Sequence, residues 1–290
     1  MTPSFTLDSP MPPVWIMYPH ISQYSIGWRM GYGEGYKFKL GDWKETLSEE
    51  QQRQYEELFP HPVFWREYYN PDYDFEDIED FECGTVQLWH KNGEMQYSRE
   101  KLTEQAKSSP LSYLFFWKPN PDALGKFCLG QWQPSYFEVD TDEYSCAEQY
   151  MMAEKARLFE DTETESRIMQ STDPKEMKAF GQKVKNFDQS IWDKAKYSIV
   201  LNGNYYKFAQ NKDMRDFLLS TGNQILVEAS PLDTIWGIGL AEDNAKALDP
   251  TTWRGSNLLG FALMEVRDEL RKVYKNYHII DWTKLKEYTV

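Results

Sequence analysis

Histidine and cysteine are scarce in this chain of 290 residues, and their positions argue against several kinds of catalytic site. The four histidines are His20, His61, His90 and His278. None lies between residues 91 and 277, so we expect no Ser-His-Asp triad or Cys-His pair there. The three cysteines, Cys83, Cys128 and Cys146, form no Cys-x-x-Cys pair. This sparse set offers no clustered zinc ligands and fits a reducing compartment.

Long apolar runs and nucleotide-binding loops are also missing. The clearest apolar run, residues 113–117, is far shorter than a membrane span. The N-terminus has no basic region followed by an apolar core, so we expect a cytoplasmic protein without a secretion signal or a membrane contact. There is no Walker loop, and Gly31, Gly33 and Gly35 lack the full spacing of a phosphate loop and favour tight turns.

Positive charge is in short supply. The net charge is −14 and the pI is near 4.8. A protein that holds nucleic acid through many phosphates is usually basic, so we do not expect non-specific nucleic-acid binding. Residues 174–215 differ, with nine Lys or Arg against four Asp or Glu. This local excess indicates either a site for a phosphate-bearing substrate or a pair of solvated helices.

Residues 1–110 are expected to form an accessory region. The glycine-rich and aromatic-rich residues 25–39 predict short strands with tight turns, and residues 48–59 predict a helix capped by Ser48. Residues 66–82 carry eight acidic residues against one arginine, which indicates a solvated loop or a strip that docks a protein partner. Residues 84–98 predict a β-hairpin around Asn92-Gly93.

Residues 111–290 are expected to form the main domain. Helices are predicted at residues 145–160, 174–184, 189–210, 212–220 and 256–273, and a buried strand at 224–229. Residues 127–139 predict extended structure broken by Pro134. The predicted fold class is therefore α+β: a mainly helical C-terminal domain with a few strands, after an aromatic-rich N-terminal region with a hairpin.

Carboxylates and aromatic rings are the chemistry that remains, and they suit hydrolysis of a glycosidic bond. Its transition state is an oxocarbenium-like cation, which a carboxylate stabilises or attacks through an activated water. Glu148 is one candidate, seven residues before Lys155 on the same face of a predicted helix. The spacing Ser145-x-x-Glu148 also fits a capping box, which would make the role of Glu148 purely structural.

Asp233 is the second candidate, in a loop that follows the predicted strand. Pro231 precedes it, and Gly237 and Gly239 follow, so the loop has a fixed shape and can approach a ligand closely. Loops on rigid scaffolds often carry function. A simple aspartate turn is the alternative reading of the same residues.

Several segments, taken together, resemble the NADAR (YbiA-like) family of N-glycosidases. Residues 137–159 resemble the signature of the first family helix, and Trp192 matches the tryptophan before the long helix. Motifs at 219–222, 226–230, 233–239 and 255–267 follow in the family order. The resemblance covers residues from about 125 to 271. The first 110 residues match nothing in the compact members of the family.

The resemblance implies an activity and a set of site residues. The family cleaves phosphoribosylamino intermediates of riboflavin synthesis, or ADP-ribose attached to guanine. Its functional glutamate, tryptophan and aspartate fall on Glu148, Trp192 and Asp233. Substrate-binding roles are further expected for Lys155, Trp132, Gln131, Tyr150, Trp236, Gly237 and Asn257. No metal and no cofactor are implied.

One departure from the family bears on function. Many members carry serine where Gly130 stands, so a hydroxyl that would bind the ribose or phosphate of the ligand is absent. We therefore keep two hypotheses: an N-glycosidase, and a protein that binds ADP-ribose or a related nucleotide without turnover. In the first, Asp233 should face Glu148 across a cleft within roughly 10 Å. Repulsion between the two carboxylates should then raise one pKa.

Overall fold

The structure, a computed structural model, describes residues 4–65, 86–90 and 94–288, and the chain forms two compact units. The described residues of the first unit are 4–65, 138–142 and 269–288, and those of the second are 86–90, 94–137 and 143–268. Both ends of the chain thus belong to the first unit. The predicted accessory region 1–110 and main domain 111–290 stay a prediction.

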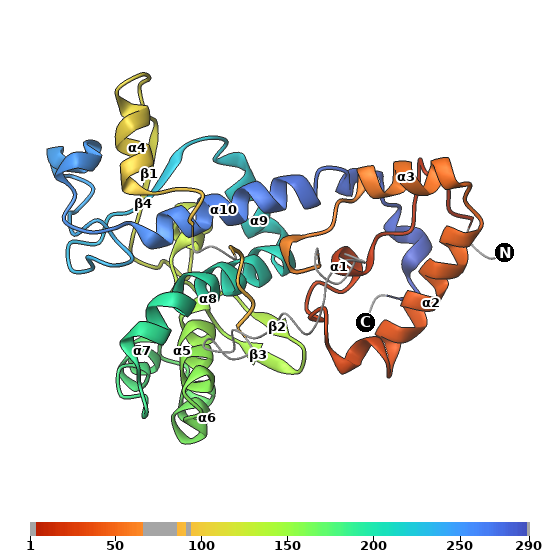
Figure 1. The fold of residues 1–290 in the computed structure, drawn as a ribbon, viewed down its shortest axis with the longest axis horizontal. Coiled ribbons are helices and arrows are strands. Elements are labelled where there is room, and N and C mark those ends of the chain that lie inside the picture. The colour runs from red at the N-terminus through yellow and green to blue at the C-terminus, as the bar shows by residue number, and fades with distance from the viewer. Residues whose placement is uncertain (1–3, 66–85, 91–93, 289–290) are drawn as a thin grey trace. The chain divides into compact units, whose positions relative to one another are not determined.

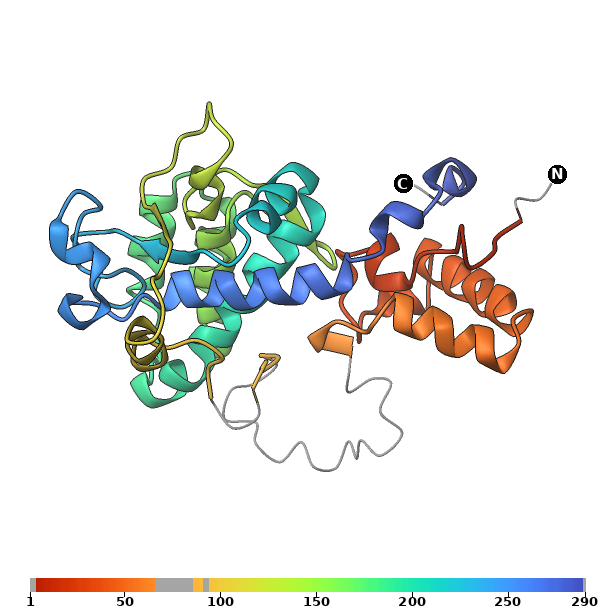
Figure 2. The same cartoon turned by 90° about the horizontal axis from the view of Figure 1, so that it is seen from above.

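The first unit is helical. It contains α1 (Val14–Met17), α2 (Tyr32–Glu45) and α3 (Glu49–Leu58), together with the 3-10 turns Ile26–Trp28, Val63–Trp65, Tyr277–Ile279 and Trp282–Leu285. Helix α3 follows α2 closely along the chain (Figures 1 and 2), and the two helices are joined by an aromatic contact between Trp43 and Tyr55, whose ring centres are 5.3 Å apart. The helix predicted at residues 48–59 is confirmed, with Ser48 and Gln51 forming a capping box.

The prediction of short strands at residues 25–39 is wrong, because α2 occupies residues 32–39. Tyr36, Leu40 and Trp43 are buried, and their spacing of four and three residues places them on one face of a helix. Gly33 lies so close to the carbonyl of Gly27 that a Cβ would come within 2.6 Å of it. Glycine at position 33 therefore allows the helix to pack closely against the backbone of Gly27; it does not form a tight turn.

Two predictions concern residues that the structure describes only in part or not at all. The acidic residues 66–82 lie outside the described residues, and their role in binding a protein partner stays a prediction. The turn of the predicted hairpin, Asn92-Gly93, also lies outside. Its described flanks, residues 86–90 and 94–98, form no strand, so the hairpin is not confirmed.

The second unit is mainly helical, as predicted for the main domain. Its helices are α4 (Arg99–Ala106), α5 (Ala147–Leu158), α6 (Thr162–Gln170), α7 (Pro174–Gly181), α8 (Gln189–Gln210), α9 (Lys212–Ser220) and the greater part of α10 (Leu258–Val273). Helix α5 packs against α6, α7 and α8 (Figure 1). The 3-10 turns are Lys126–Leu129, Ala245–Leu248 and Pro250–Thr252. No helix among the described residues is long and apolar enough to cross a membrane.

Two pairs of short strands complete the described structure. Strand β1 (Tyr113–Phe116) runs parallel to β4 (Ile225–Glu228), with Phe116 opposite Glu228. Strand β2 (Phe137–Val139) pairs with β3 (Asp142–Tyr144). The strand predicted at 224–229 is confirmed, whereas the predicted extended segment 127–139 is strand only at Phe137–Val139 and begins in a 3-10 turn.

Asn257 fixes the end of β4. Its side chain is fully buried and accepts a hydrogen bond from the Glu228 backbone N–H (3.0 Å) while donating one to the Leu226 carbonyl (3.0 Å). Gly260, in the first turn of α10, approaches the Leu226 carbonyl so closely that a Cβ would come within 2.1 Å of it. The start of α10 therefore determines where the last residue of β4 lies.

Candidate active site

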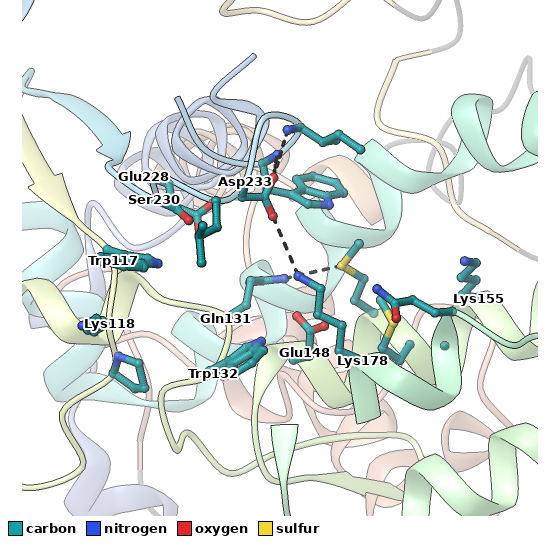
Figure 3. A pocket seen from close by; sticks show the side chains of 18 of the residues that line it. Trp117, Lys118, Gln131, Trp132, Glu148, Lys155, Lys178, Glu228, Ser230 and Asp233 are labelled. Carbon is teal, nitrogen blue, oxygen red and sulfur yellow. Dashed lines mark hydrogen bonds and ion pairs between the residues drawn. The ribbon is translucent and has the colours of Figure 1, made fainter. Parts of the chain in front are cut away.

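The second unit contains a cavity of about 550 Å³. Its walls come from residues 117–119 after β1, residues 131–132, helices α5 and α7, Trp192 in the first turn of α8, and residues from 228 to 236 around the end of β4 (Figure 3). The cavity thus lies beyond the carboxyl ends of the parallel strands β1 and β4, which is where α/β proteins commonly bind ligands.

Glu148 lines this cavity, and its side chain takes no part in capping the helix. Helix α5 begins at Ala147 after Cys146, and the backbone N–H of Glu148 donates to the Gln131 carbonyl (3.0 Å). Ser145 instead bonds to the side chain of Gln149, through both its N–H (2.7 Å) and its hydroxyl (2.8 Å). The predicted capping box at Ser145 and Glu148 is therefore wrong, because the N-cap residue is Cys146, one residue after Ser145.

The surroundings of Glu148 raise the pKa of its carboxyl group. Only 6 % of the residue is exposed, and burial raises the pKa of its carboxyl to about 7. The Lys178 ammonium and a hydrogen bond from Trp132 oppose that rise, and the charge of Asp233 adds to it. A carboxyl with a pKa near neutrality can accept or release a proton under physiological conditions.

Asp233 lines the same cavity and also shapes its own loop. Its Oδ1 accepts hydrogen bonds from the backbone N–H groups of Ile235 (2.9 Å) and Trp236 (2.8 Å), which is an aspartate turn. Its Oδ2 lies 3.9 Å from the Lys178 ammonium, and Figure 3 draws both side chains toward the cavity. The two readings of Asp233, turn residue and cavity carboxylate, are thus compatible in one side chain.

Glu228 is a third carboxyl on the cavity, and the sequence analysis missed it. It ends β4, where the three preceding residues are buried and apolar. Burial, followed by the charges of Asp233 and Glu148, raises the pKa of this carboxyl to about 8. A lone acidic residue that closes an apolar strand and precedes a shaped loop was the signal in the sequence.

Three lysines bring positive charge to the cavity: Lys118, Lys155 and Lys178. Only Lys178 belongs to the basic stretch 174–215, so this stretch does not form the expected cationic wall. Lys207, from the same stretch, is fully buried and donates to the Gly130 carbonyl (3.0 Å). Lys155 places its ammonium 5.1 Å from the centre of the Trp192 ring, which is a cation–π contact.

Most of the residues predicted to bind substrate line the cavity, and three do not. Those that do are Gln131, Trp132, Lys155, Trp192 and Trp236. Tyr150 is buried between the rings of Tyr144, Phe137 and Tyr206. Asn257 holds β4, and Gly237 lies beneath the Asp233 loop, where a Cβ would meet the carbonyls of Glu228 and Asp233.

Gly130, which replaces the serine of many family members, does not line the cavity either. A Cβ at this position would lie 3.3 Å from the Trp117 carbonyl and 3.4 Å from the Phe127 carbonyl. Glycine therefore suits the tight packing of this turn. Its carbonyl accepts from Lys207, so the local role of residue 130 is structural.

Fold and site together define a mainly helical domain with a cavity lined by aromatic rings and carboxyl groups. A sequence profile of the NADAR domain matches residues 115–271, which is more than half of the chain. The chain belongs to the NADAR family.

Named relatives agree with this membership. N-glycosidase R617 of Acanthamoeba polyphaga mimivirus is 44 % identical over 162 residues, which cover 54 % of this chain and 95 % of that protein. Protein irg-1 of Caenorhabditis elegans is 40 % identical over 44 % of this chain and 61 % of its own length. N-glycosidase Npun_R5314 of Nostoc punctiforme is 30 % identical over 50 % of this chain and 86 % of that protein. The family thus includes hydrolases of N-glycosyl bonds.

Proposed function

We propose that the second unit hydrolyses the N-glycosidic bond of a ribosyl-phosphate or ADP-ribosyl compound. The observation that carries this proposal is the buried carboxyl of Glu148, in a cavity walled by tryptophans and lysines. Cleavage passes through an oxocarbenium-like cation, which a nearby carboxylate stabilises. Burial strengthens this effect because little water screens the charge.

Each cavity residue has a role in this proposal. Glu148 takes a proton from the water that attacks C1′ of the ribose. Asp233 orients the ribose or the leaving group through Oδ2, since its Oδ1 is engaged by the loop backbone. Trp192 forms a wall against a flat ring. The ammonium groups of Lys118, Lys155 and Lys178 attract the phosphates.

Two substrate classes fit the proposal: a phosphoribosylamino intermediate of the riboflavin type, and ADP-ribosylated guanine. Both carry phosphate and a flat ring, which match the lysines and tryptophans of the cavity. A volume of about 550 Å³ is within the usual range for small-molecule sites. The relatives' name, N-glycosidase, supports cleavage rather than binding alone.

The test is a paired assay with ADP-ribosylated guanosine and with riboflavin precursors. Calorimetry measures binding, and chromatography of the products measures release of the free base or amine. We expect both binding and release with one of the two substrate classes. Binding without release would favour the alternative, a protein that holds ADP-ribose or a related nucleotide without turnover.

A further inference from the structure

Glu228 differs from the other two cavity carboxyls in its contacts. Its Oε2 is buried and accepts no hydrogen bond from any residue that the structure describes. Asp233, by contrast, accepts two backbone N–H bonds and faces Lys178, and Glu148 interacts with Lys178 and Trp132. Lys178 and Trp132 partly offset the effect of burial on Glu148, whereas a buried oxygen without a hydrogen-bond partner favours the neutral acid.

The backbone holds Glu228 firmly at the cavity. Asn257 binds its N–H, and its carbonyl accepts from the N–H of Ile238 (2.9 Å). The parallel register sets it opposite Phe116, the residue before Trp117, and in Figure 3 the side chains of Glu228, Ser230 and Trp117 occupy one side of the view, with Lys155 on the other. A flat ring that enters this end can stack on Trp117 within reach of Glu228.

We infer that Glu228 donates the proton that the leaving base needs as the N-glycosidic bond breaks. This inference rests on the proposed function and adds a residue to it. Water forms a bond to C1′ and passes a proton to the Glu148 carboxylate. The C1′–N bond breaks, its electron pair goes to the base nitrogen, and that nitrogen takes the proton of Glu228. Proton exchange with solvent then restores Glu228 and Glu148.

The charges around Glu228 agree with this division of roles. The charges of Asp233 and Glu148 disfavour its ionisation, and that of Lys178 opposes them less strongly. Lys118 and Lys155 also line the cavity. From the start of α10 the contact is the uncharged amide of Asn257. Burial raises the pKa of both Glu228 and Glu148, and of these two only Glu228 has a buried oxygen without a hydrogen-bond partner among the described residues, which suits it to hold the proton.

The experiment compares wild type with Glu228→Gln in the release of guanosine from ADP-ribosylated guanosine and of amine from riboflavin precursors, between pH 5.5 and 9.5. Glutamine still donates a hydrogen bond to the base but cannot transfer a proton. We therefore expect kcat to fall about 10²- to 10⁴-fold with little change in KM, and the loss of rate above about pH 8 to disappear. Glu143→Gln, at an exposed carboxylate of β3, is the matched control and should behave as wild type.

The outcomes are distinct. An active wild type with an equally active Glu228→Gln variant, or one that keeps the loss of rate at high pH, overturns the role of Glu228 and leaves the proposed function standing. A wild type that releases no base from either substrate overturns the proposed function, and the proton transfer with it. Carbon-13 NMR titration of glutamate-labelled wild type needs no variant: a Glu228 carboxyl already ionised at pH 6 also contradicts the inference.

Discussion

At the scale of single residues, the site depends on carboxyls that the fold removes from water by different means. Glu148 is buried by helix packing, whereas Glu228, at the end of a strand, is half-buried with its Oε2 fully enclosed. Asp233 remains partly exposed and is held by its own loop. Three carboxyl groups that line one cavity are therefore held in three different environments.

Substitutions at Trp192 test whether the aromatic wall of the cavity binds the ligand. Base–aromatic stacking is worth roughly 1–3 kcal/mol. We therefore expect Trp192→Ala to weaken ligand binding by about ten- to a hundredfold, and Trp192→Phe to weaken it much less. Calorimetric titration with ADP-ribose measures both. If both variants lose the same stability and keep their affinity, Trp192 is a core residue.

The sequence led to some of these residues and not to others. Glu148, Trp192 and Asp233 were recognisable from motifs, and all three line the cavity. Glu228 was missed because a strand that is buried on both faces has no alternation of polar and apolar residues. Its sequence pattern therefore does not distinguish a functional polar residue at its end from an ordinary one. Its environment depends on Asp233, Glu148 and Lys178, which approach it only in the folded chain.

At the scale of secondary-structure elements, the contact between α10 and β4 positions one side of the cavity. We expect Gly260→Ala to destabilise the second unit by roughly 1–3 kcal/mol, since its Cβ would come within 2.1 Å of the Leu226 carbonyl. The shift of β4 should lower base release as well, because it moves Glu228. Thermal denaturation and the release assay measure the two effects.

Gly41→Ala provides the control for adding a methyl group to a helical glycine. Gly41 lies in α2, and a Cβ there would meet no atom within 4 Å. Alanine should therefore leave stability unchanged or raise it by up to about 1 kcal/mol. Equal behaviour of Gly41→Ala and Gly260→Ala would mean that the contact between α10 and β4 is not a constraint.

The elements also show where sequence patterns were sufficient. Helices α7, α8 and α9 begin within a residue of their predicted positions, and aspartates before α7 and α8 cap them through side-chain hydrogen bonds. Helix α2 was mistaken for strands because glycine usually disfavours helices. Packing of Tyr36, Leu40 and Trp43 outweighs that preference, and local sequence does not record such packing.

At the scale of the whole molecule, Glu148 and Glu228 link stability to pH. Their folded pKa values, about 7 for Glu148 and about 8 for Glu228, exceed the ordinary value of 4.5. The folded protein therefore binds more protons than the unfolded chain between about pH 4.5 and 8, and this contribution to stability is lost as pH rises through that range.

Substitution of each glutamate separates its contribution to the pH dependence of stability from that of the other titratable groups. Glu148→Gln and Glu228→Gln should each have a higher melting temperature than wild type at pH 8.5, because each removes a charge that is costly to bury. At pH 5 the difference should shrink, since wild type then carries both protons. Differential scanning calorimetry at the two pH values measures this, and a difference that does not depend on pH would contradict the assigned protonation.

The organisation of the chain was the hardest feature to predict. The first unit takes residues 4–65, 138–142 and 269–288, so it includes the turn of the β2–β3 pair with the adjoining strand residues, and the residues after 268. Composition changes near residue 110 indicated a boundary there, but composition is local and packing is not. The motifs of the NADAR domain, by contrast, fall in order along residues 115–271.

The central claim is that the Glu148 carboxylate drives cleavage of an N-glycosidic bond, and Glu148→Gln tests it most directly. Chromatography measures release of the base or amine by wild type, Glu148→Gln and the control Glu143→Gln, with the melting temperature of each. We predict that Glu148→Gln loses at least about 10²-fold in kcat while its melting temperature at pH 7 stays equal or rises. Near wild-type release by Glu148→Gln, or a loss of activity that only follows unfolding, would contradict the account.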